Sequence, residues 1–538
     1  MLIYNIDISK LLKQMADLLE IKGANRFRVR AYRNAARNIE TLNQDVRDLI
    51  KTEKDLTEIP GVGKDIAAKM MQIVETGKLK QLQELQQELP AGLLQLLAIE
   101  GLGPKRVKQL YEELNVTNWQ ELKVAAQEER IQRLDGFGPK IEKKILQRVK
   151  KKSAQEIRTL FYEAERVTEP LLAYLKKLKS VKRLAVAGSY RRKKETVGDI
   201  DILVASNKGA KICEKFAKYE DVERVISQGK TRSSVVFRTG LQVDLRVVKQ
   251  DSFGAAMQYF TGSRSHNIKL RRIAIDHNFK LNEYGLFERT KNEKKIAGAD
   301  EEKIYQLLDM KWIPPELRES RGEIEAAQQD KLPNLIKLEQ IRGDLQMHTK
   351  ASDGINTAEE MMEAARDLGY EYIAITDHSQ NLKVAHGLDK KRYRDQFKII
   401  DELNKKYSNF QILKSAEVDI LKDGKLDLDE EVLAEFDLIV CSIHSHFNLS
   451  EKEQTERVVK AMQSPYFHIF GHPTGRLINR REPYQLDMEK VLKTARANNC
   501  IMEINAQPSR LDLSAKQARM AKEMGVKISF GTDAHQVN

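Results

Sequence analysis

The feature that most constrains the fold of this chain is an apolar run that carries two acidic residues in alternate positions. Asp199 and Asp201 stand in the sequence Asp-Ile-Asp-Ile-Leu-Val. Alternate residues of a β-strand point to the same face of a sheet, so both carboxylates leave one face together. Paired carboxylates suit divalent cations, which take oxygen ligands. The run therefore predicts a β-sheet that carries a metal-binding pair.

Two further segments extend this pair to a candidate site for phosphate chemistry. Gly188-Ser189 ends another apolar run and offers N–H and hydroxyl donors to anionic oxygens, and two arginines follow it. Asp244 lies in a β-branched run that we expect to form the neighbouring strand. Three carboxylates can hold two Mg²⁺ ions about 3.5 to 4 Å apart, which predicts nucleotidyl transfer. A plain turn followed by a solvated edge strand is the alternative interpretation.

These segments resemble the catalytic signature of the nucleotidyltransferase superfamily, and the sequence after them resembles the family X DNA polymerases, the relatives of polymerase beta. The resemblance implies that Asp199, Asp201 and Asp244 hold two Mg²⁺ ions. In that family the aromatic pair at the positions of Tyr259 and Phe260 excludes a 2′-hydroxyl on the incoming nucleotide. A buried aromatic cluster is the alternative role of these two residues here. The resemblance also implies a dNTP site made of Gly188, Ser189, Arg192, Tyr259, Phe260, Gly262, Asn267 and Arg271.

Charge and histidine content divide the 538 residues into two parts, and a chain of this length is expected to hold several domains. Residues 1–335 contain 63 Lys and Arg against 47 Asp and Glu, whereas residues 336–538 contain 29 against 32. The basic part is the one expected to contact a polyanion. Eight of the ten histidines lie in the second part. Two different chemistries are therefore expected.

The basic part contains three copies of a glycine hairpin followed by an amphipathic helix, at residues 59–64, 100–105 and 135–140. The glycines permit positive φ and let backbone amides approach a phosphate. Such helix-hairpin-helix units hold the DNA backbone without reading its sequence. The third copy can equally serve packing alone. The expected DNA contacts are Gly61, Gly63, Lys64, Gly101, Gly103 and Lys105.

The first hairpin belongs to a helical segment that resembles the lyase domain of polymerase beta. The resemblance assigns 5′-phosphate binding to Arg28, the shape of the pocket to Tyr32 and the Schiff-base nucleophile to Lys69. Asp65 occupies a position that is basic in that family. A simple phosphate contact is the alternative role of Lys69, so lyase activity stays open.

In residues 336–538, short apolar strands tend to end in histidine or carboxylate residues. The carboxyl ends of the strands are where an α/β barrel builds its active site. Imidazoles with carboxylates suit Mn²⁺, Zn²⁺ or Fe²⁺, and such a cluster can activate water against a phosphodiester. This part resembles the polymerase and histidinol phosphatase (PHP) family, beginning at residues 344–354. The resemblance implies up to three metal ions held by His348, Asp353, His378, Glu417, His444, His472, Asp533 and His535.

The PHP resemblance departs from the family pattern at its first motif. That family begins with His-x-His, and Gln346 stands at the first of these positions. An amide oxygen is a poorer ligand than imidazole, so the occupancy of one metal position stays open. The chain ends three residues after His535, which predicts a short barrel closure or a truncated chain.

The expected architecture is multidomain, with all-α helix-hairpin-helix domains, an α+β nucleotidyltransferase palm with a small α+β nucleotide-selection subdomain, and an α/β PHP barrel of distorted TIM-like form. The expected limits are a lyase-like domain at 1–80, a helix-hairpin-helix subdomain at 81–150, the palm at 151–250, the nucleotide-selection subdomain at 251–315, a linker at 316–335 and the barrel at 336–538.

The resemblance as a whole implies filling of short gaps in DNA with a 5′-phosphate during repair. The PHP barrel would add 3′-5′ exonuclease or 3′-end phosphoesterase activity, and AP-endonuclease activity stays open. One alternative is a template-independent nucleotidyltransferase acting on RNA or small molecules. The other is a polymerase with a catalytically silent, structural PHP barrel.

The sequence also indicates where such a protein works. Cys213, Cys441 and Cys500 are scattered without metal-type spacing, which is typical of a reduced cytosolic setting. The sequence has neither a secretory signal nor an apolar run of about 18 residues. We therefore expect a cytoplasmic, nucleoid-associated monomer without a membrane partner.

Overall fold

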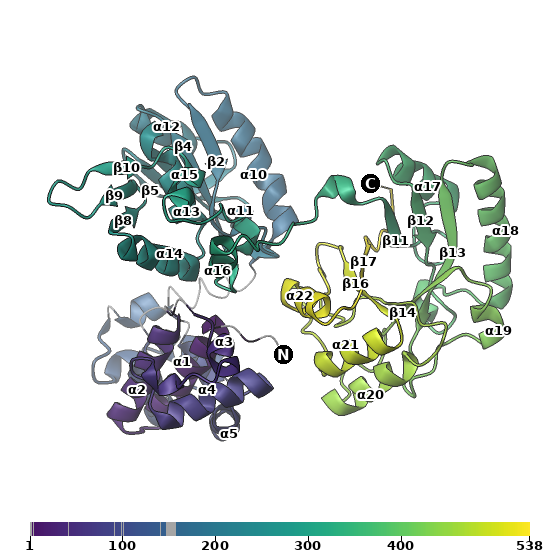
Figure 1. The fold of residues 1–538 in the computed structure, drawn as a ribbon, viewed down its shortest axis with the longest axis horizontal. Helices are drawn as coiled ribbons and strands as arrows, with labels where there is room; N and C mark the ends of the chain where they lie inside the picture. The colour runs from purple at the N-terminus through teal and green to yellow at the C-terminus, as the bar shows by residue number, and fades with distance from the viewer. Residues whose placement is uncertain are drawn as a thin grey trace. The chain divides into compact units, whose positions relative to one another are not determined.

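The computed structural model of the chain describes residues 3–146, except residues 4, 41, 43, 91, 98, 100, 101 and 140, and residues 158–537. It forms two compact units, Met1–Pro333 and Asn334–Asn538, which are treated separately below (Figure 1). Among the described residues, no helix has both the length and the apolar character needed to span a membrane.

The first unit begins with helices that share one apolar core, in which Leu12, Met15, Val107 and Leu110 have no exposed surface. Each helix turns a 3.6-residue apolar stripe towards that core. The helices are α1 (Asn5–Ile21), α2 (Arg26–Glu40), α3 (Val46–Lys51), α4 (Lys64–Thr76), α5 (Lys80–Glu88), α6 (Gly92–Leu96), α7 (Pro104–Leu114) and α8 (Trp119–Gln127).

The three expected hairpins adopt one common turn. A backbone N–H donates to the carbonyl three residues earlier in each copy, from Val62 to Ile59 at 2.9 Å, from Leu102 to Ile99 at 2.9 Å and from Phe137 to Leu134 at 3.1 Å. The first two hairpins lead into α4 and α7, and the third leads into helical residues 139 and 141–146. The internal repeat seen in the sequence is therefore a structural repeat.

The palm is a five-stranded sheet in the order β2-β4-β7-β6-β5. Its strands are β2 (Arg183–Val186), β4 (Asp199–Ala205), β5 (Val222–Gln228), β6 (Arg232–Phe237) and β7 (Gln242–Val248). A short antiparallel pair, β1 (Thr159–Leu160) and β3 (Thr196–Val197), and the turn of helix α11 (Gly188–Arg191) flank this sheet.

The two faces of the palm sheet differ because β4 alternates. Its residues Ile200, Ile202 and Val204 pack against α10 (Phe161–Lys176) and α12 (Gly209–Ala217). Its residues Leu203 and Ala205 pack against α13 (Phe253–Thr261). Asp199 and Asp201 share the alternation of Leu203, so they belong to the face that carries α13.

The nucleotide-selection subdomain joins α13 and α14 (Arg264–Asp276) to a three-stranded antiparallel sheet. Its remaining elements are β8 (Phe279–Asn282), β9 (Gly285–Glu288), β10 (Lys295–Ala297), α15 (Glu301–Gln306) and α16 (Glu323–Gln328).

The segment from residue 316, which the sequence suggested to be a linker, packs into this subdomain as far as α16. Ile324 and Ala327 are buried in its core. Arg318 is fully buried and donates to Glu301 at 2.6 Å, and Glu323 contacts His266 Nδ1 at 2.8 Å. The charged side chains of this run are thus neutralised by residues distant in sequence, which a local charge pattern does not show.

The second unit is a nearly closed barrel of seven parallel strands in sequence order. They are β11 (Gly343–Met347), β12 (Tyr372–Ile375), β13 (Gln411–Asp419), β14 (Leu438–Ser442), β15 (Ile469–Phe470), β16 (Ile501–Asn505) and β17 (Ile528–Gly531). The His348 N–H closes the ring by donating to the Ala534 carbonyl at 2.8 Å. The expected fold class is confirmed, with seven strands where a TIM barrel has eight.

Helices cover the outside of this barrel (Figure 1). They are α17 (Ala358–Asp367), α18 (Lys390–Lys406), α19 (Glu430–Leu433), α20 (Glu451–Ala461), α21 (Met488–Ala497) and α22 (Ala515–Glu523). Five of them begin at a Thr, Asp or Ser whose side chain accepts a hydrogen bond from the first turn, which is the usual helix cap: α17, α18, α20, α21 and α22.

Candidate active sites

The three acidic residues of the palm lie on two neighbouring strands. β4 and β7 pair in parallel, with Asp201 directly opposite Asp244 and Asp199 opposite Gln242. Gly188 lies against this cluster with φ +63°, and a Cβ at this position would collide with the carboxylate of Asp201. A glycine is thus required for the Gly-Ser turn to approach the carboxylates.

The carboxylates of this cluster repel one another, and a bound cation would relieve that repulsion. Burial and the charges of Asp199 and Asp244 raise the pKa of Asp201 to about 7. Burial and the charge of Asp244 also raise the pKa of Asp199. Carboxylates that repel one another in this way are the oxygen ligands that divalent ions take. The donor set therefore fits the expected pair of metal ions.

The expected sugar-contacting residues lie beside the carboxylates. Phe260, Asp201 and Asp244 line one small cavity of about 90 Å³. Tyr259 meets Phe260 edge-on, with ring centroids 5.1 Å apart. The guanidinium of Arg246 lies over the Phe260 ring at 4.6 Å. Both aromatic side chains are half-buried, so they border the site instead of filling the core.

Asn267 and Arg271 are held next to this aromatic pair by hydrogen bonds. The amide of Asn267 donates to the Tyr259 carbonyl at 2.6 Å and accepts from Gln258 at 2.7 Å. The Arg271 Nε donates to the Asn267 carbonyl at 3.3 Å. Both predicted residues therefore lie on α14, where Asn267 contacts Tyr259 and Arg271 contacts Asn267.

Arg192, which is expected to bind the triphosphate, already forms an ion pair with a carboxylate. Its Nε donates to Glu319 Oε1 at 2.9 Å and its Nη1 donates to the Thr261 carbonyl. Lys194 lies 3.6 Å from the same Glu319 oxygen. A Cβ at Gly262 would lie 3.2 Å from Arg192 Nη1, so the glycine gives this guanidinium room. The carboxylate of Glu319 thus occupies donors of Arg192 that the resemblance assigns to the triphosphate.

Sequence reasoning missed Glu319 because it lies in the charged run that was interpreted as a linker. A carboxylate that binds a phosphate-binding arginine must be exchanged for the triphosphate. We expect Glu319→Gln to lower KM for the dNTP roughly fivefold with kcat unchanged, since a partly exposed pair is worth about 1 kcal/mol. Steady-state single-nucleotide incorporation measures both constants.

The matched control for this prediction is Glu316→Gln, three residues earlier on an exposed position of the same segment. It removes the same charge without touching Arg192, so KM should stay at the wild-type value. A higher KM in Glu319→Gln would show instead that Glu319 holds Arg192 in its binding position.

The hairpins present their glycines and lysines as a phosphate site would require. Gly63 and Gly103 are the residues before α4 and α7, and nothing lies within 4 Å of a Cβ built on either. Lys64 and Lys105 are exposed at the starts of these helices. Gly61 has φ +78°. Gly101 and Lys140 lie outside the residues that the structure describes.

The residues assigned to the lyase-type pocket lie close together, but Lys69 is paired with a carboxylate. Lys69 forms an ion pair with Asp65, and the Tyr32 hydroxyl donates to Asp65 at 3.3 Å. The hydrogen bond from Lys69 lowers the pKa of Asp65, to which the charge of Arg28 also contributes. A lysine nucleophile needs a free amine, whereas the side-chain nitrogen of Lys69 is engaged by the carboxylate of Asp65.

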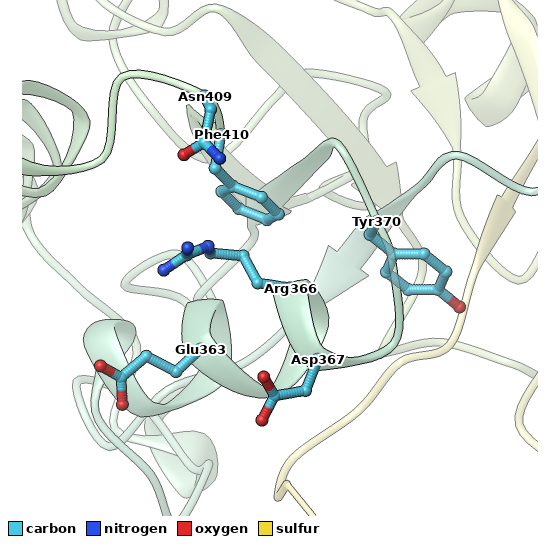
Figure 2. Close-up of a pocket in the computed structure, with 6 residues that line it drawn as sticks. All are labelled: Glu363, Arg366, Asp367, Tyr370, Asn409 and Phe410. Carbon is cyan, nitrogen blue, oxygen red and sulfur yellow. The ribbon is translucent and has the colours of Figure 1, made fainter.

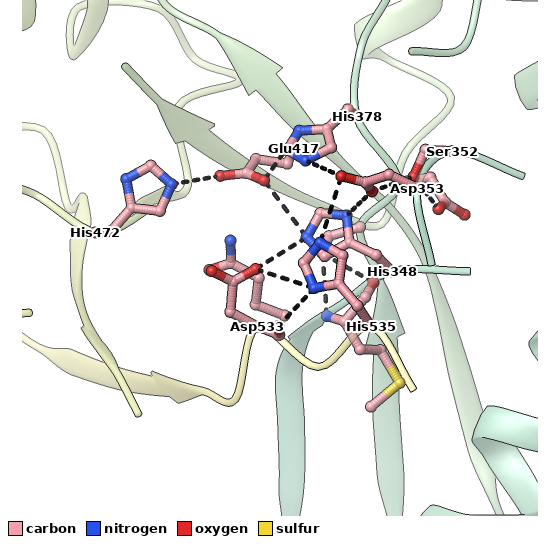
Figure 3. Close-up of polar contacts among 12 residues, drawn as sticks. His348, Ser352, Asp353, His378, Glu417, His472, Asp533 and His535 are labelled. Atoms are coloured by element: carbon pink, nitrogen blue, oxygen red, sulfur yellow. Dashed lines mark hydrogen bonds and ion pairs between the residues drawn. The ribbon is translucent and has the colours of Figure 1, made fainter. Parts of the chain in front are cut away.

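All eight residues expected to ligate metal in the barrel converge at the carboxyl ends of its strands. Figure 3 shows those other than His444. Glu417 on β13 is the centre: its carboxylate lies 2.9 Å from His472, 3.2 Å from His378 and 3.5 Å from both His348 and His444. Asp353 lies 3.6 Å from His378 and 3.5 Å from His535. Asp533 lies 3.2 Å from His348.

Within this cluster two groups have the spacing of a metal centre. One is made by His348, Asp353, His378 and His535, and the other by His378, Glu417 and His444. Several buried ring nitrogens of the whole cluster make no hydrogen bond, namely both nitrogens of His348, Nδ1 of His378 and Nδ1 of His472. Unpartnered imidazole nitrogens beside carboxylates are what a bound transition metal requires.

Gln346 also points into the barrel. It is fully buried, and neither its amide oxygen nor its amide nitrogen has a partner. Its side chain lies beside Gly471, where a Cβ would sit 3.7 Å from the amide oxygen. The amide oxygen therefore stands beside Gly471, the residue before His472.

Burial and the neighbouring carboxylates act in opposite directions on the pKa of these histidines. Burial opposes the imidazolium of His348, but the carboxylate of Asp533, 3.2 Å from its Nε2, and the charge of Glu417 raise its pKa to about 9. Burial lowers the pKa of His378 to about 4. Burial opposes ionisation of Asp353 too, but the hydrogen bond from His535 and nearby histidines lower its pKa to about 2.

Two residues that the sequence did not single out support this site. Asp419 contacts Nδ1 of His444 at 2.5 Å, which leaves Nε2 of His444 facing Glu417. Arg510 lies 3.5 Å from Asp533 and lines the cavity of about 440 Å³ above the cluster. Asp419 stands two residues after Glu417 on one strand, so alternation could have placed it on the same face.

A second hollow of the barrel lies at the other end of the strands (Figure 2). Glu363, Arg366 and Asp367 of α17 line it with Tyr370, which precedes β12, and with Asn409 and Phe410, which precede β13. Its mixed charges stand at the amino ends of these strands. It is therefore separate from the histidine cluster.

Comparison with known families covers most of the chain. The matched families are a helix-hairpin-helix domain (residues 3–79), a SAM-like helix-hairpin-helix tandem (93–151), the DNA polymerase beta palm (161–278), the DNA polymerase beta thumb (256–319) and the PHP domain (344–507). The polymerase beta palm and thumb, together with the PHP domain, define a family X DNA polymerase that is joined to a phosphoesterase-type domain.

Individual relatives show the same combination. The chain is 40% identical over 533 residues to the DNA polymerase/3′-5′ exonuclease PolX of Bacillus subtilis (strain 168), covering 99% of this chain and 92% of that protein. Its barrel is 32% identical over 203 residues to a probable phosphatase of Thermoanaerobacter sp. (strain X514), covering 36% of this chain and 78% of that protein. DNA polymerase lambda of Arabidopsis thaliana is 25% identical over 303 residues, covering 50% of this chain and 54% of that protein.

The chain belongs to the PolX family, the family X DNA polymerases that carry a C-terminal PHP domain. The expected family is thereby confirmed. Its polymerase part binds DNA and deoxynucleotides, and its two catalytic domains depend on divalent metal ions.

Proposed function

We propose that this protein fills short gaps in DNA and trims 3′ ends, using separate sites in the palm and in the barrel. The observation that carries the first activity is the position of Asp201 opposite Asp244, against the Gly188 turn. The second activity is carried by the cluster of eight histidine and carboxylate residues, in which the carboxylate of Glu417 meets four histidines. The helix-hairpin-helix turns support a DNA substrate over RNA or a small molecule.

In the palm, the side chains bind and orient the reactants. Asp199, Asp201 and Asp244 hold the two divalent ions, for which Mg²⁺ is our assignment; when bound, these ions lower the pKa of the attacking 3′-hydroxyl and stabilise the leaving pyrophosphate. Ser189 and Arg192 bind triphosphate oxygens after Arg192 releases Glu319. Phe260 and Tyr259 pack against the sugar, where their rings leave no room for a 2′-hydroxyl.

In the barrel, Glu417 and its histidines hold the second set of ions, with Mn²⁺ as the first candidate. When bound, the ions activate a water against the terminal phosphodiester. Asp419 orients His444 through Nδ1. Arg510, at the wall of the cavity, is placed to bind a phosphate oxygen of the scissile strand.

We further propose that the protein acts as a monomer at the nucleoid, on gaps that carry a 5′-phosphate. Arg28, beside Tyr32 at the lyase-type pocket, is the residue we assign to that phosphate. Lyase chemistry is the least supported activity, because Lys69 is paired with Asp65. The open cavity above the histidine cluster is compatible with cleavage at abasic sites as well.

Metal removal tests the proposal as a whole. Wild-type protein is stripped with a chelator and offered DNA with a one-nucleotide gap and a labelled primer. We expect neither extension nor shortening until metal is restored, then extension by one nucleotide with Mg²⁺ and dNTP, and shortening with Mn²⁺ alone. Extension that ignores the template base would favour a template-independent transferase, and absence of shortening with every metal would favour a silent barrel.

A further inference from the structure

A basic hollow lies on the palm, past the end of β4 that is remote from Asp199. It has a volume of about 630 Å³ and is lined by the turn after α10, by residues 206 and 207, and by the first turns of α12. No aspartate or glutamate lines it. Its lysines, all exposed, are Lys177, Lys179, Lys182, Lys208, Lys211 and Lys215.

These lysines lack the carboxylate partners that other lysines of the chain have. Lys218, further along α12, pairs with Glu214 at 2.8 Å. The charges of Lys211 and Lys215 also help to lower the pKa of Glu214, but its carboxylate is paired with Lys218. None of the six forms an ion pair within the described part of the chain. Six like charges around one hollow repel one another, and a bound polyanion relieves that repulsion.

The backbone at this hollow adds to its positive potential. α12 is nine residues long and begins at Gly209, and no side chain caps its first turn. The free amides of a helix start carry partial positive charge and bind phosphate oxygens. Ser206 and Asn207, which precede the helix, offer further polar groups to the same space.

The hollow is distinct from the polymerase site. α10 and α12 cover the face of the sheet opposite to the one that carries Asp201. Five residues separate Asp201 from Ser206, which is about 16 Å along an extended strand. A phosphate bound in the hollow therefore lies well away from the reacting 3′ end.

We propose that this lysine hollow is a second DNA contact of the palm, which holds the phosphate backbone of the substrate away from the reacting end. No aromatic residue lines it, so it binds phosphates without stacking bases and without reading sequence. With one phosphate of a strand for about every 3.4 Å of helix axis, the contact falls about five or more nucleotides from the primer terminus. It therefore adds affinity for longer DNA.

Salt dependence of DNA binding tests this contact. The dissociation constant of a 40-nucleotide primer-template is measured between 50 and 200 mM salt for wild type and for Lys208→Gln/Lys211→Gln/Lys215→Gln. Each lost phosphate contact reduces the logarithmic salt slope by about 0.9, so three reduce it by about 2.7. The loss of affinity across this fourfold salt range should then be about 40-fold smaller than in wild type. The rate of extension at saturating DNA should not change.

The matched control removes three lysines that have carboxylate partners, in Lys218→Gln/Lys280→Gln/Lys398→Gln. Its slope should equal that of wild type. An unchanged slope in the hollow variant, or an equal fall in the control, would overturn the proposal.

Protection from an amine-acylating reagent separates DNA from other phosphate sources. We expect the primer-template to protect Lys208, Lys211 and Lys215, and tripolyphosphate at equal phosphate concentration to leave them reactive. Protection by tripolyphosphate but not by DNA would assign the hollow to a free polyphosphate and overturn the DNA contact.

Discussion

Asp201→Asn should abolish nucleotide addition while leaving 3′-end shortening intact. Asp201 lies opposite Asp244 and against Gly188, so it is the carboxylate that joins the neighbouring strand to the Gly-Ser turn. Loss of a metal ligand removes several kcal/mol of transition-state stabilisation, and about 4 kcal/mol corresponds to a 10³-fold fall in kcat. Single-turnover extension of gapped DNA measures the loss, and shortening of the same primer with Mn²⁺ measures the retained activity.

The fold of this variant should be at least as stable as that of wild type in metal-free buffer. The pKa of Asp201 is raised to about 7 in the folded protein, above its ordinary value of 3.8, so ionisation of this group costs folding stability as pH rises through that interval. Asparagine keeps the shape without the charge, so the gain should be largest at about pH 8. Urea unfolding at pH 8 and pH 5 checks this sign.

Glu223→Gln, on the exposed edge strand β5, is the matched control and should keep both activities. Loss of shortening together with extension in a folded Asp201→Asn protein would contradict the assignment of the two reactions to separate sites.

The local motifs could be predicted from the sequence because each one lies on a single strand or turn. Asp199 and Asp201 stand on one strand, the glycines of each hairpin on one turn, and most barrel ligands at or just after the end of an apolar run. Strand alternation and the barrel rule then gather these residues without knowledge of distant contacts. The resemblance to known families supplied the remaining roles.

Contacts between residues distant in sequence could not be predicted in this way. Glu319 reaches Arg192 across 127 positions, and Arg318 is buried through Glu301, although both stand in a run of charges that is typical of a linker. The lysine hollow is similar, because residues after α10 and residues at the start of α12 meet only when the palm sheet forms. A charge pattern records composition, whereas burial of a charge depends on which partner the fold provides.

Glu417→Gln should abolish 3′-end shortening while leaving extension intact. The carboxylate lies within 3.5 Å of four histidines, His348, His378, His444 and His472, and it is fully buried. A glutamine keeps the size of the side chain but removes the charge that would balance the metal ions. We expect the rate of shortening with Mn²⁺ to fall about 10³-fold or more, since the ligand contributes several kcal/mol.

The metal content of the purified protein gives an independent measure of this change. Elemental analysis should show fewer transition-metal ions per chain in Glu417→Gln than in wild type, whereas Asp201→Asn should retain the wild-type number. This readout separates loss of metal from any other cause of lost activity, because it does not depend on DNA.

Glu363→Gln makes the same substitution in the hollow at the opposite end of the same barrel. It should keep shortening, extension and metal content, since Glu363 stands at the amino ends of the strands, away from every ligand. If Glu417→Gln still shortened primers at the wild-type rate, the nuclease would lie outside the histidine cluster, and the barrel would have to be structural. Because Glu417 joins ligands from four other strand ends, no single histidine substitution tests the cluster as completely.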